Sequence, residues 1–234
     1  MHARDDASRS FWLETCGDDL TPRPALDGSV DVDVAIMGAG YTGLWTAYQV
    51  LRREPGLRVA VVEGEIAGFG ASGRNGGWCY PSIAIGPGEL TRRFGREAAR
   101  ATLLAIENAV REVDRTCTAE GIEADIARDG GMEVARASWQ LPKVIGAYEE
   151  YEAAGMGDHV ELLDAAQTLA RVPAAGAIAA FRKKEAIAMQ PAKLARGAAR
   201  AVERLGGTIY EQTPVTDYHG GERPRLVTGR GEVR

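Results

Sequence analysis

The sequence predicts an α/β fold that begins with a parallel βαβ unit, and three observations support this prediction. First, residues 32 to 37 form an apolar run that is typical of a strand buried on both faces of a parallel sheet. Second, the segment after it has apolar residues at i, i+3, i+4 and i+7 and stops at Pro55 and Gly56, which predicts a helix. The apolar face of that helix consists of Leu44, Ala47, Tyr48 and Leu51. Third, residues 57 to 62 form a second apolar run, which completes the unit.

A glycine turn, GAGYTG, connects the first strand to the helix. Gly38 permits a tight turn, Gly40 leaves room for a pyrophosphate beside the backbone, and Gly43 lets the helix pack closely against the sheet. The helix N-terminus offers N–H groups and the positive end of its dipole to phosphates. The pattern therefore predicts a Rossmann-like dinucleotide site that includes Gly38, Ala39, Gly40, Tyr41, Thr42 and Gly43.

An acidic residue is placed where such a site needs one. Glu63 ends the second strand, 20 residues after Gly43. A carboxylate there can accept hydrogen bonds from both ribose hydroxyls of an adenosine, and it would repel the 2′-phosphate of NADP. We therefore expect Glu63 to bind the ribose, and NADP is disfavoured.

Composition and charge exclude several other functions. The 234 residues, 45% of them hydrophobic, are enough for one large or two small domains with a core. A net charge of -5 gives no basic surface, so we expect no nucleic-acid partner. No apolar run approaches the roughly 20 residues of a membrane span, and the N-terminus lacks the apolar stretch of a signal peptide. We expect a cytoplasmic protein without a membrane partner. The three cysteines and three histidines are isolated, so no metal site is predicted.

The choice between NAD and FAD as the cofactor depends on the segment GEIAGFGASGRNGGWCYP, residues 64 to 81. In a simple NAD-binding unit an ordinary crossover helix follows the second strand. Here five glycines crowd ten residues, which indicates close approach to phosphates or to a flat group; they are Gly68, Gly70, Gly73, Gly76 and Gly77.

Four blocks of sequence carry a resemblance to a known family: SFWLET, DVAIMGAGYTGLWTAYQVL, VAVVEGEIAGFGASGRNGG and AMQPAKLARGAARAVERLGGTIYEQTPV. The chain resembles the FAD-dependent amine and amino-acid oxidases related to D-amino-acid oxidase, glycine oxidase and sarcosine oxidase, most nearly the gamma-glutamylputrescine oxidase branch. The resemblance implies that SGRNGG passes the pyrophosphate and runs beneath the flavin. It also implies that the main chain of Val215 holds the adenine. The FAD contacts that follow are Ser72, Arg74, Asn75, Gly76, Gly77 and Val215; a serine hydroxyl and an arginine fork suit a diphosphate.

The function implied by the resemblance is the oxidation of a small-molecule amine or amino acid. A hydride would pass from the carbon bearing nitrogen to flavin N5, giving an imine, and oxygen would become hydrogen peroxide. Two alternatives stay open: a flavin-dependent dehydrogenase with another electron acceptor, and a catalytically silent dinucleotide-binding fragment. The catalytic residues, the identity of the amine and the oligomeric state are left unknown.

The remaining elements are expected to add part of a substrate domain. A long amphipathic helix is predicted around residues 99 to 117, a hairpin at Asp129 and Gly130 between strands near residues 126 and 134, and a helix over residues 141 to 151. Asp164 and Gln167 have the spacing of a capping box. Pro191 starts a helix that ends at Gly206, and a strand follows over residues 208 to 211.

The expected domains follow from this order. Residues 1–30 are an irregular N-terminal lead-in, 31–120 the first part of the FAD-binding domain, 121–190 an inserted α+β portion of a substrate domain, and 191–234 an incomplete return to the FAD-binding domain. Members of the resembled family continue beyond this point, so we expect a fold truncated at the C-terminus, with a terminal strand at Glu232 that lacks partners. Such a chain alone would hold FAD loosely and be inactive.

Overall fold

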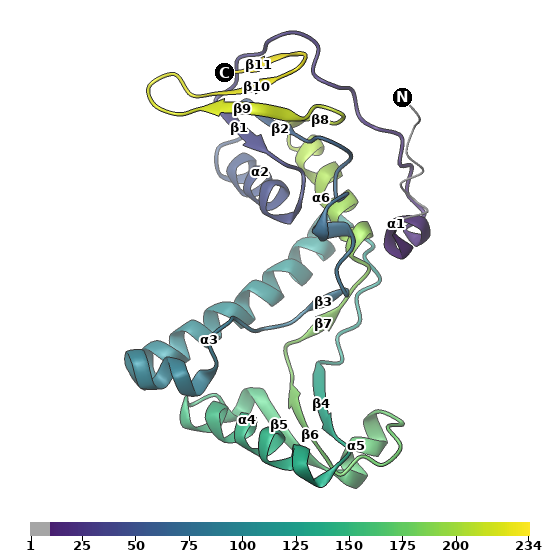
Figure 1. The fold of residues 1–234 in the computed structure, drawn as a ribbon, viewed down its shortest axis with the longest axis vertical. Coiled ribbons are helices and arrows are strands. Elements are labelled where there is room, and N and C mark those ends of the chain that lie inside the picture. Colours follow the sequence, from purple (N-terminus) through teal and green to yellow (C-terminus); the bar gives the residue numbers. More distant parts are fainter. Residues whose placement is uncertain (1–9) are drawn as a thin grey trace. The chain divides into compact units, whose positions relative to one another are not determined.

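The computed structural model describes residues 10 to 234, and their contacts divide the chain into two compact units (Figure 1). The first unit contains the residues up to Gly77, together with Cys117–Asp125 and Gln190–Arg234. The second contains Trp78–Thr116 and Ile126–Met189. This division differs from the expected boundaries, because residues 78 to 116 group with the second unit and not with the first.

The packing of the long helix α3 (Pro87–Glu120) explains this difference. Leu90, Ala99 and Leu103 lie in one core cluster with Tyr151 and Phe181 of the second unit. An apolar stripe predicts that a helix is buried, but it does not predict against which partner. The helical backbone is interrupted at Gly95, which has φ of 82°.

A parallel three-stranded sheet forms the centre of the first unit. Its order is β1 (Val34–Met37), β2 (Val59–Val62) and β8 (Thr208–Tyr210). Two helices, α2 (Tyr41–Arg53) and α6 (Pro191–Arg204), contribute to the same core cluster as this sheet. The expected βαβ unit is therefore present, and the apolar face predicted for α2 is buried.

The two strands of the βαβ unit differ in burial. All four residues of β2 are buried, as predicted, whereas β1 alternates between half-buried and exposed, and Met37 is 61% exposed. The expectation that β1 is covered on both faces was wrong for the described chain. In its sheet β1 is an edge strand that pairs with β2 alone. Only the face that carries Val34 and Ile36 packs against the core cluster that includes α2.

An antiparallel sheet with the order β11-β10-β9 completes the first unit. It consists of β9 (Val215–His219), β10 (Arg225–Thr228) and β11 (Gly231–Val233). The last strand was expected to lack partners, and this was wrong. β11 pairs with β10, Val233 forms a bridge with Val30, and its side chain is fully buried. Such pairing was invisible in the sequence because Val30 lies about 200 residues earlier in the chain.

The N-terminal segment is not wholly irregular. Residues 1 to 9 lie outside the described residues, but Phe11–Thr15 form a short helix, α1. The Oγ atom of Ser10 accepts a hydrogen bond from the N–H of Leu13 and caps this helix. The expectation of an irregular lead-in therefore holds only for the residues between α1 and β1, which include the turns at Gly17 and Gly28.

The second unit contains two antiparallel sheets. The larger has the order β4 (Gly131–Ala135), β6 (Ala179–Lys183) and β5 (Val160–Asp164), and the smaller pairs β3 (Trp78–Cys79) with β7 (Ile187–Ala188). The helix α4 (Leu141–Ala153) contributes to the core with β6, and α5 (Ala165–Arg171) begins at the predicted capping box. Two short 3-10 helices of this unit are η3 (Ser138–Gln140) and η4 (Gly157–His159), and a third, η2 (Ala71–Gly73), belongs to the first unit.

The hairpin expected at Asp129 and Gly130 is absent from the described structure. β4 pairs with β6, about 50 residues later, and Ala127 forms a bridge with Ala188. Gly130 has φ of 77° and makes a turn, but the turn leads the chain from one sheet to the other. A local Asp-Gly signal predicts a turn without specifying the partner strand.

Candidate dinucleotide-binding site

The glycine turn after β1 has the geometry that its sequence predicts. Gly38 has φ of 94°, and its N–H donates to the carbonyl of Val62 at 2.7 Å. A Cβ at Gly43 would lie 2.0 Å from the carbonyl oxygen of Gly38 and 3.2 Å from Ile36 Cγ2. Only glycine at position 43 therefore lets α2 lie this close to β1.

Gly40 and Ser72 meet at the N-terminus of α2. Gly40 is the N-cap residue in extended conformation, and a Cβ on it would lie 3.0 Å from Ser72 Oγ. Ser72 Oγ accepts a hydrogen bond from the N–H of Tyr41, at 2.8 Å. The N–H of Gly68 donates to the carbonyl of Ala39 at 2.9 Å. The two glycine-rich segments, far apart in the sequence, thus form one site at the helix N-terminus.

Glu63 points its carboxylate at the same turn. Its Oε2 accepts a hydrogen bond from the N–H of Ala39 at 2.7 Å, and its Oε1 accepts one from the N–H of Glu65 at 3.0 Å. The residue is half-buried and follows β2, at the carboxyl end of the parallel sheet. In open α/β sheets ligands bind at this end of the strands. Each carboxylate oxygen has a further lone pair, so Glu63 can also accept from a hydroxyl group.

The loop after η2 is shaped by its own side chains. Asn75 Nδ2 donates to the carbonyl of Ser72 at 3.0 Å, and Asn75 Oδ1 accepts from the N–H of Gly77 at 2.8 Å. Gly77 has φ of 74°, and the space that a Cβ of Gly76 would occupy is open. Arg74 donates from Nε to the carbonyl of Phe69, with its guanidinium carbon 4.5 Å from the centroid of the Phe69 ring. Asn75 therefore holds the loop conformation, which the resemblance had not specified.

Val215 lies beside the Glu63 segment. The N–H of Thr213 donates to the carbonyl of Glu63 at 2.8 Å, and the N–H of Gln212 donates to the carbonyl of Glu65 at 2.9 Å. Val215 opens β9 two residues later and is half-buried. Thr42 lies in the first turn of α2. All thirteen predicted positions belong to the first unit.

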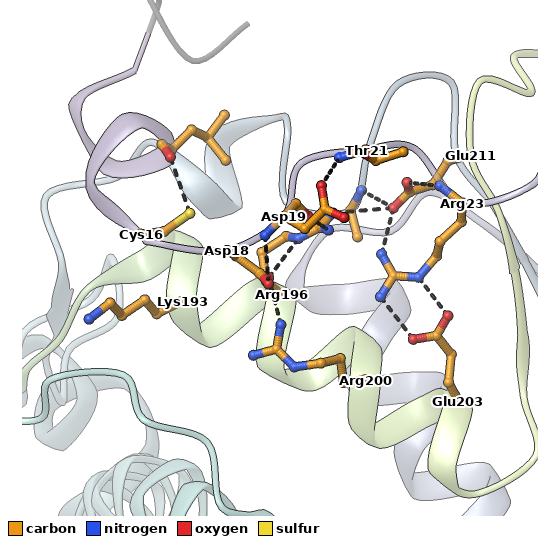
Figure 2. Close-up of polar contacts among 12 residues, drawn as sticks. Cys16, Asp18, Asp19, Thr21, Arg23, Lys193, Arg196, Arg200, Glu203 and Glu211 are labelled. Carbon is orange, nitrogen blue, oxygen red and sulfur yellow. Dashed lines mark hydrogen bonds and ion pairs between the residues drawn. The ribbon is translucent and has the colours of Figure 1, made fainter.

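A buried acid that no sequence pattern indicated holds the glycine-rich loop of this site in place. Glu211 is fully buried, directly after β8 (Figure 2). Its Oε1 accepts from the N–H of Ala67 at 2.7 Å and from Arg23 Nη1 at 2.9 Å. Arg196 of α6 contributes a longer contact, 3.5 Å from Nη1 to Oε1. Two guanidinium groups thus compensate the buried carboxylate, which in turn fixes the glycine-rich loop.

The same arginines connect the N-terminal segment to α6. Arg23 forms a second ion pair with Glu203, while Arg196 and Arg200 both contact the carboxylate of Asp18 (Figure 2). Burial raises the pKa of Asp18, but the hydrogen bond from Arg196 and the charge of Arg200 outweigh it, so this pKa lies below its usual value. Arg196 was detectable in the sequence, because it lies among the small apolar residues of the buried face of α6.

Gln190 connects the start of α6 to the N-terminal segment. Its Oε1 accepts from the N–H of Lys193 at 2.8 Å and caps α6, and its Nε2 donates to the carbonyl of Trp12 at 2.6 Å. Leu13 and Cys16 of the α1 segment pack in one cluster with Ala192, with Phe69 against it. The amide of Gln190 can accept from Lys193 and donate to Trp12 at the same time, because an amide has an acceptor and donors, whereas a carboxylate has acceptors alone.

The residues at the site fit an adenine dinucleotide. Gly38 and Gly40 carry no side chain, the N–H of Tyr41 at the start of α2 is bonded to Ser72 Oγ, and the Glu63 carboxylate accepts from the N–H of Ala39 at the end of β2. Within the described residues, no group of three or more His, Cys, Asp or Glu side chains is arranged to hold a metal ion. Across residues 10 to 234, no helix is both long and apolar enough to cross a membrane.

The fold and this site define an α/β protein of the dinucleotide-binding class. Residues 33–234 match the family described as DAO, FAD dependent oxidoreductase, and the chain belongs to this family, whose cofactor is FAD. It is 31% identical over 224 residues to the gamma-glutamylputrescine oxidoreductase of Escherichia coli K12, an alignment that covers 96% of this chain and 52% of that protein.

Solved structures show the same fold. Glycine oxidase from Geobacillus kaustophilus superposes with a TM-score of 0.66 and 23% identity over 87% of this chain and 53% of the other. L-amino acid deaminase from Proteus vulgaris superposes with a TM-score of 0.70 and 20% identity over 92% of this chain and 48% of the other. The chain spans about half the length of these relatives.

Proposed function

We propose that the protein oxidises a small amine or amino acid with bound FAD, with gamma-glutamylputrescine as the substrate and oxygen as the electron acceptor. One observation carries the proposal: the glycine turn, Glu63 and the loop around Ser72 converge at the carboxyl ends of β1 and β2 in a member of an FAD-dependent family. The similarity to a gamma-glutamylputrescine oxidoreductase over nearly the whole chain supports the choice of substrate.

Each predicted residue has a role in this proposal. The N-terminus of α2, with Gly38, Gly40 and Ser72 around it, would hold the pyrophosphate, and Glu63 would accept hydrogen bonds from the ribose. The main chain of Val215 would contact the adenine. The remaining contacts would come from Ala39, Tyr41, Thr42, Gly43, Arg74, Asn75, Gly76 and Gly77.

The division of labour follows from what these side chains offer. When bound, FAD supplies the redox chemistry, taking a hydride from the carbon that bears nitrogen and passing electrons to oxygen, while water hydrolyses the imine product. The chain contributes binding and orientation, and no residue of it is assigned as a catalytic acid or base. The cytoplasmic location expected from the sequence stays a prediction.

The test combines a spectrum with two activity measurements. The purified chain is reconstituted with FAD, and its visible spectrum shows whether flavin is bound. Hydrogen peroxide is then followed with gamma-glutamylputrescine, sarcosine and glycine in air, and dye reduction is followed without oxygen. Peroxide release at about 1 per second or more with gamma-glutamylputrescine supports the proposal. Dye reduction without peroxide indicates a dehydrogenase. Flavin binding without either reaction indicates the catalytically silent dinucleotide-binding fragment that the sequence predicts for this chain alone. Failure to bind flavin overturns the proposal.

A further inference from the structure

The second unit contains a buried lysine next to a cavity. Lys183, the last residue of β6, is only 8% exposed, and its Nζ donates to the carbonyl of Pro81 at 3.0 Å. Among the described residues no carboxylate forms an ion pair with it. Buried charges in proteins are normally paired, so this arrangement requires an explanation.

Two aromatic rings face the ammonium group. Lys183 Nζ lies 4.4 Å from the centroid of the Tyr80 ring and 5.0 Å from that of Tyr151. Gly131, which pairs with Lys183 across the sheet, makes room for Tyr80, since a Cβ on it would lie 2.4 Å from Tyr80 Cε2. Cation–π contacts stabilise the charge but are weaker than an ion pair in a desolvated place. They leave the ammonium able to bind an anion.

A cavity of about 150 Å³ lies on the same face of the sheet. Lys183, Phe181 and Glu133 line it from β6 and β4, and Tyr151 and Glu150 line it from α4. At ~30 Å³ for each water-sized group, the volume holds about five such groups. That is the size of an α-amino-carboxylate head, which has a carboxylate and an ammonium on one carbon.

The charges around the cavity have both signs that such a head needs. Lys183 supplies a cation for the carboxylate. Glu150 supplies an anion for the ammonium, and its own position is fixed by the N–H of Gly88, which donates to Glu150 Oε2 at 3.2 Å. Glu133 lines the cavity as well, although Lys143 already pairs with it at 3.0 Å. Burial lowers the pKa of Lys183, whereas the charges of Glu133 and Glu107 oppose this shift.

We propose that this cavity binds the α-amino-carboxylate head of a gamma-glutamyl compound, with Lys183 on the carboxylate and Glu150 on the ammonium. The gamma-glutamyl end of gamma-glutamylputrescine carries such a head, while its other end carries the amine. The assignment of the head to the oxidised substrate rests on the proposed function, whereas binding of the head does not.

The probe is gamma-glutamyl-n-butylamide, which has the head but no second amine to oxidise. Calorimetry measures its affinity for the wild type and for Lys183→Met, which keeps the length of the side chain and removes its charge. The matched control is Lys184→Met, the same change at the neighbouring exposed lysine. We expect Lys183→Met to weaken binding about tenfold or more and Lys184→Met to leave it unchanged. n-Butylamine, which lacks the head, should not bind the cavity.

A second measurement needs no variant and so does not depend on whether Lys183→Met folds. In the wild type, NMR shifts of backbone N–H groups are followed as the probe is added. Shifts at Lys183 and Gly88 support the proposal, because both lie beside the proposed ligand positions. Equal affinity of the two lysine variants, or shifts that avoid Lys183 and Gly88, overturns it.

These outcomes separate the two proposals. If Lys183→Met does not change the turnover of gamma-glutamylputrescine, the proposed binding of the head in the cavity is refuted, and the proposed oxidase activity is supported. If the probe binds at Lys183 but no amine is turned over, the proposed binding of the head is supported, and the proposed oxidase activity of the chain is refuted. The variant Gly40→Val, which should lose FAD, is expected to bind the probe as tightly as the wild type.

Discussion

The N–H of Ala67 donates to the carboxylate of Glu211 at 2.7 Å, although 144 residues separate them in the chain. This bond ties the glycine-rich loop of the candidate site to the end of β8. The carboxylate is fully buried and depends on Arg23 and Arg196 for compensation. The loop that should approach the cofactor is therefore fixed by a charged network and not by packing alone.

Replacing the buried carboxylate of Glu211 should destabilise the first unit. Glu211→Gln leaves two arginines facing a neutral amide, so we expect the free energy of unfolding to fall by about 3–5 kcal/mol. The control is Glu203→Gln, which removes the 39% exposed partner of the same Arg23 and should change stability by less than about 1 kcal/mol. Urea unfolding measures both. Equal effects would show that burial of the network contributes nothing.

Two glycines of the turn should respond differently to an added side chain. At Gly43 a Cβ meets backbone 2.0 Å away, so Gly43→Ala should lower stability by about 1–3 kcal/mol. At Gly40 the nearest atom is Ser72 Oγ, at 3.0 Å, and Ser72 can rotate. Gly40→Val should therefore abolish FAD binding with a smaller loss of stability. Gly56→Ala, with open space around it, is the control for both.

Thermal unfolding and flavin fluorescence separate these two effects. The role given to Gly40 fails if Gly40→Val keeps its FAD through gel filtration. The role given to Gly43 fails if Gly43→Ala melts at the same temperature as Gly56→Ala.

The carboxylate at the end of β2 should affect affinity more than stability. Glu63→Gln replaces one acceptor oxygen by an NH₂ group that cannot accept from the N–H of Ala39 or from a ribose hydroxyl. We expect the binding of FAD to weaken by about 1–3 kcal/mol. Calorimetry with FAD measures this, with the exposed Glu54→Gln as the control. Affinity that equals the control would remove Glu63 from the site.

Local patterns in the sequence predicted the βαβ unit, the capping box and the limits of α6. These features depend on residues within one or two turns of each other, such as Asp164 and Gln167. The positions of Gly38, Gly43 and Glu63 followed from the same short-range rules. The geometry at Gly38 and Gly43 agrees with the prediction, because a glycine turn between a strand and a helix has few alternatives, whereas the role of Glu63 at a ribose stays a prediction.

Partners far apart in the sequence were not predicted. Three contacts depend on the tertiary fold: the pairing of β4 with β6, the bridge between Val30 and Val233, and the hydrogen bond from Ala67 to Glu211. Propensity and periodicity contain no information on which strand comes next to which. The cavity at Lys183 was missed for the same reason, since Tyr80 and Tyr151 are brought together only by the fold.

The ion pairs of Asp18 should make stability depend on pH in a defined window. The pKa of Asp18 is lowered below its usual value of 3.8, so the folded state favours the charged carboxylate. The stabilisation is present in full above pH 3.8 and is lost as the pH falls below this value. At neutral pH Asp18→Asn should lower the melting temperature by no more than about 2–4 °C, the effect of ~1 kcal/mol in a protein of this size.

Below the lowered pKa of folded Asp18 the wild type and Asp18→Asn should converge, because both then carry a neutral side chain next to Arg196 and Arg200. Asp27→Asn, the same change at an exposed residue, should differ little from the wild type at any pH. Melting curves between pH 7 and the acid range compare the three proteins. A difference between wild type and Asp18→Asn that stays constant into acid would mean that the lost stability comes from packing of the side chain and not from its charge.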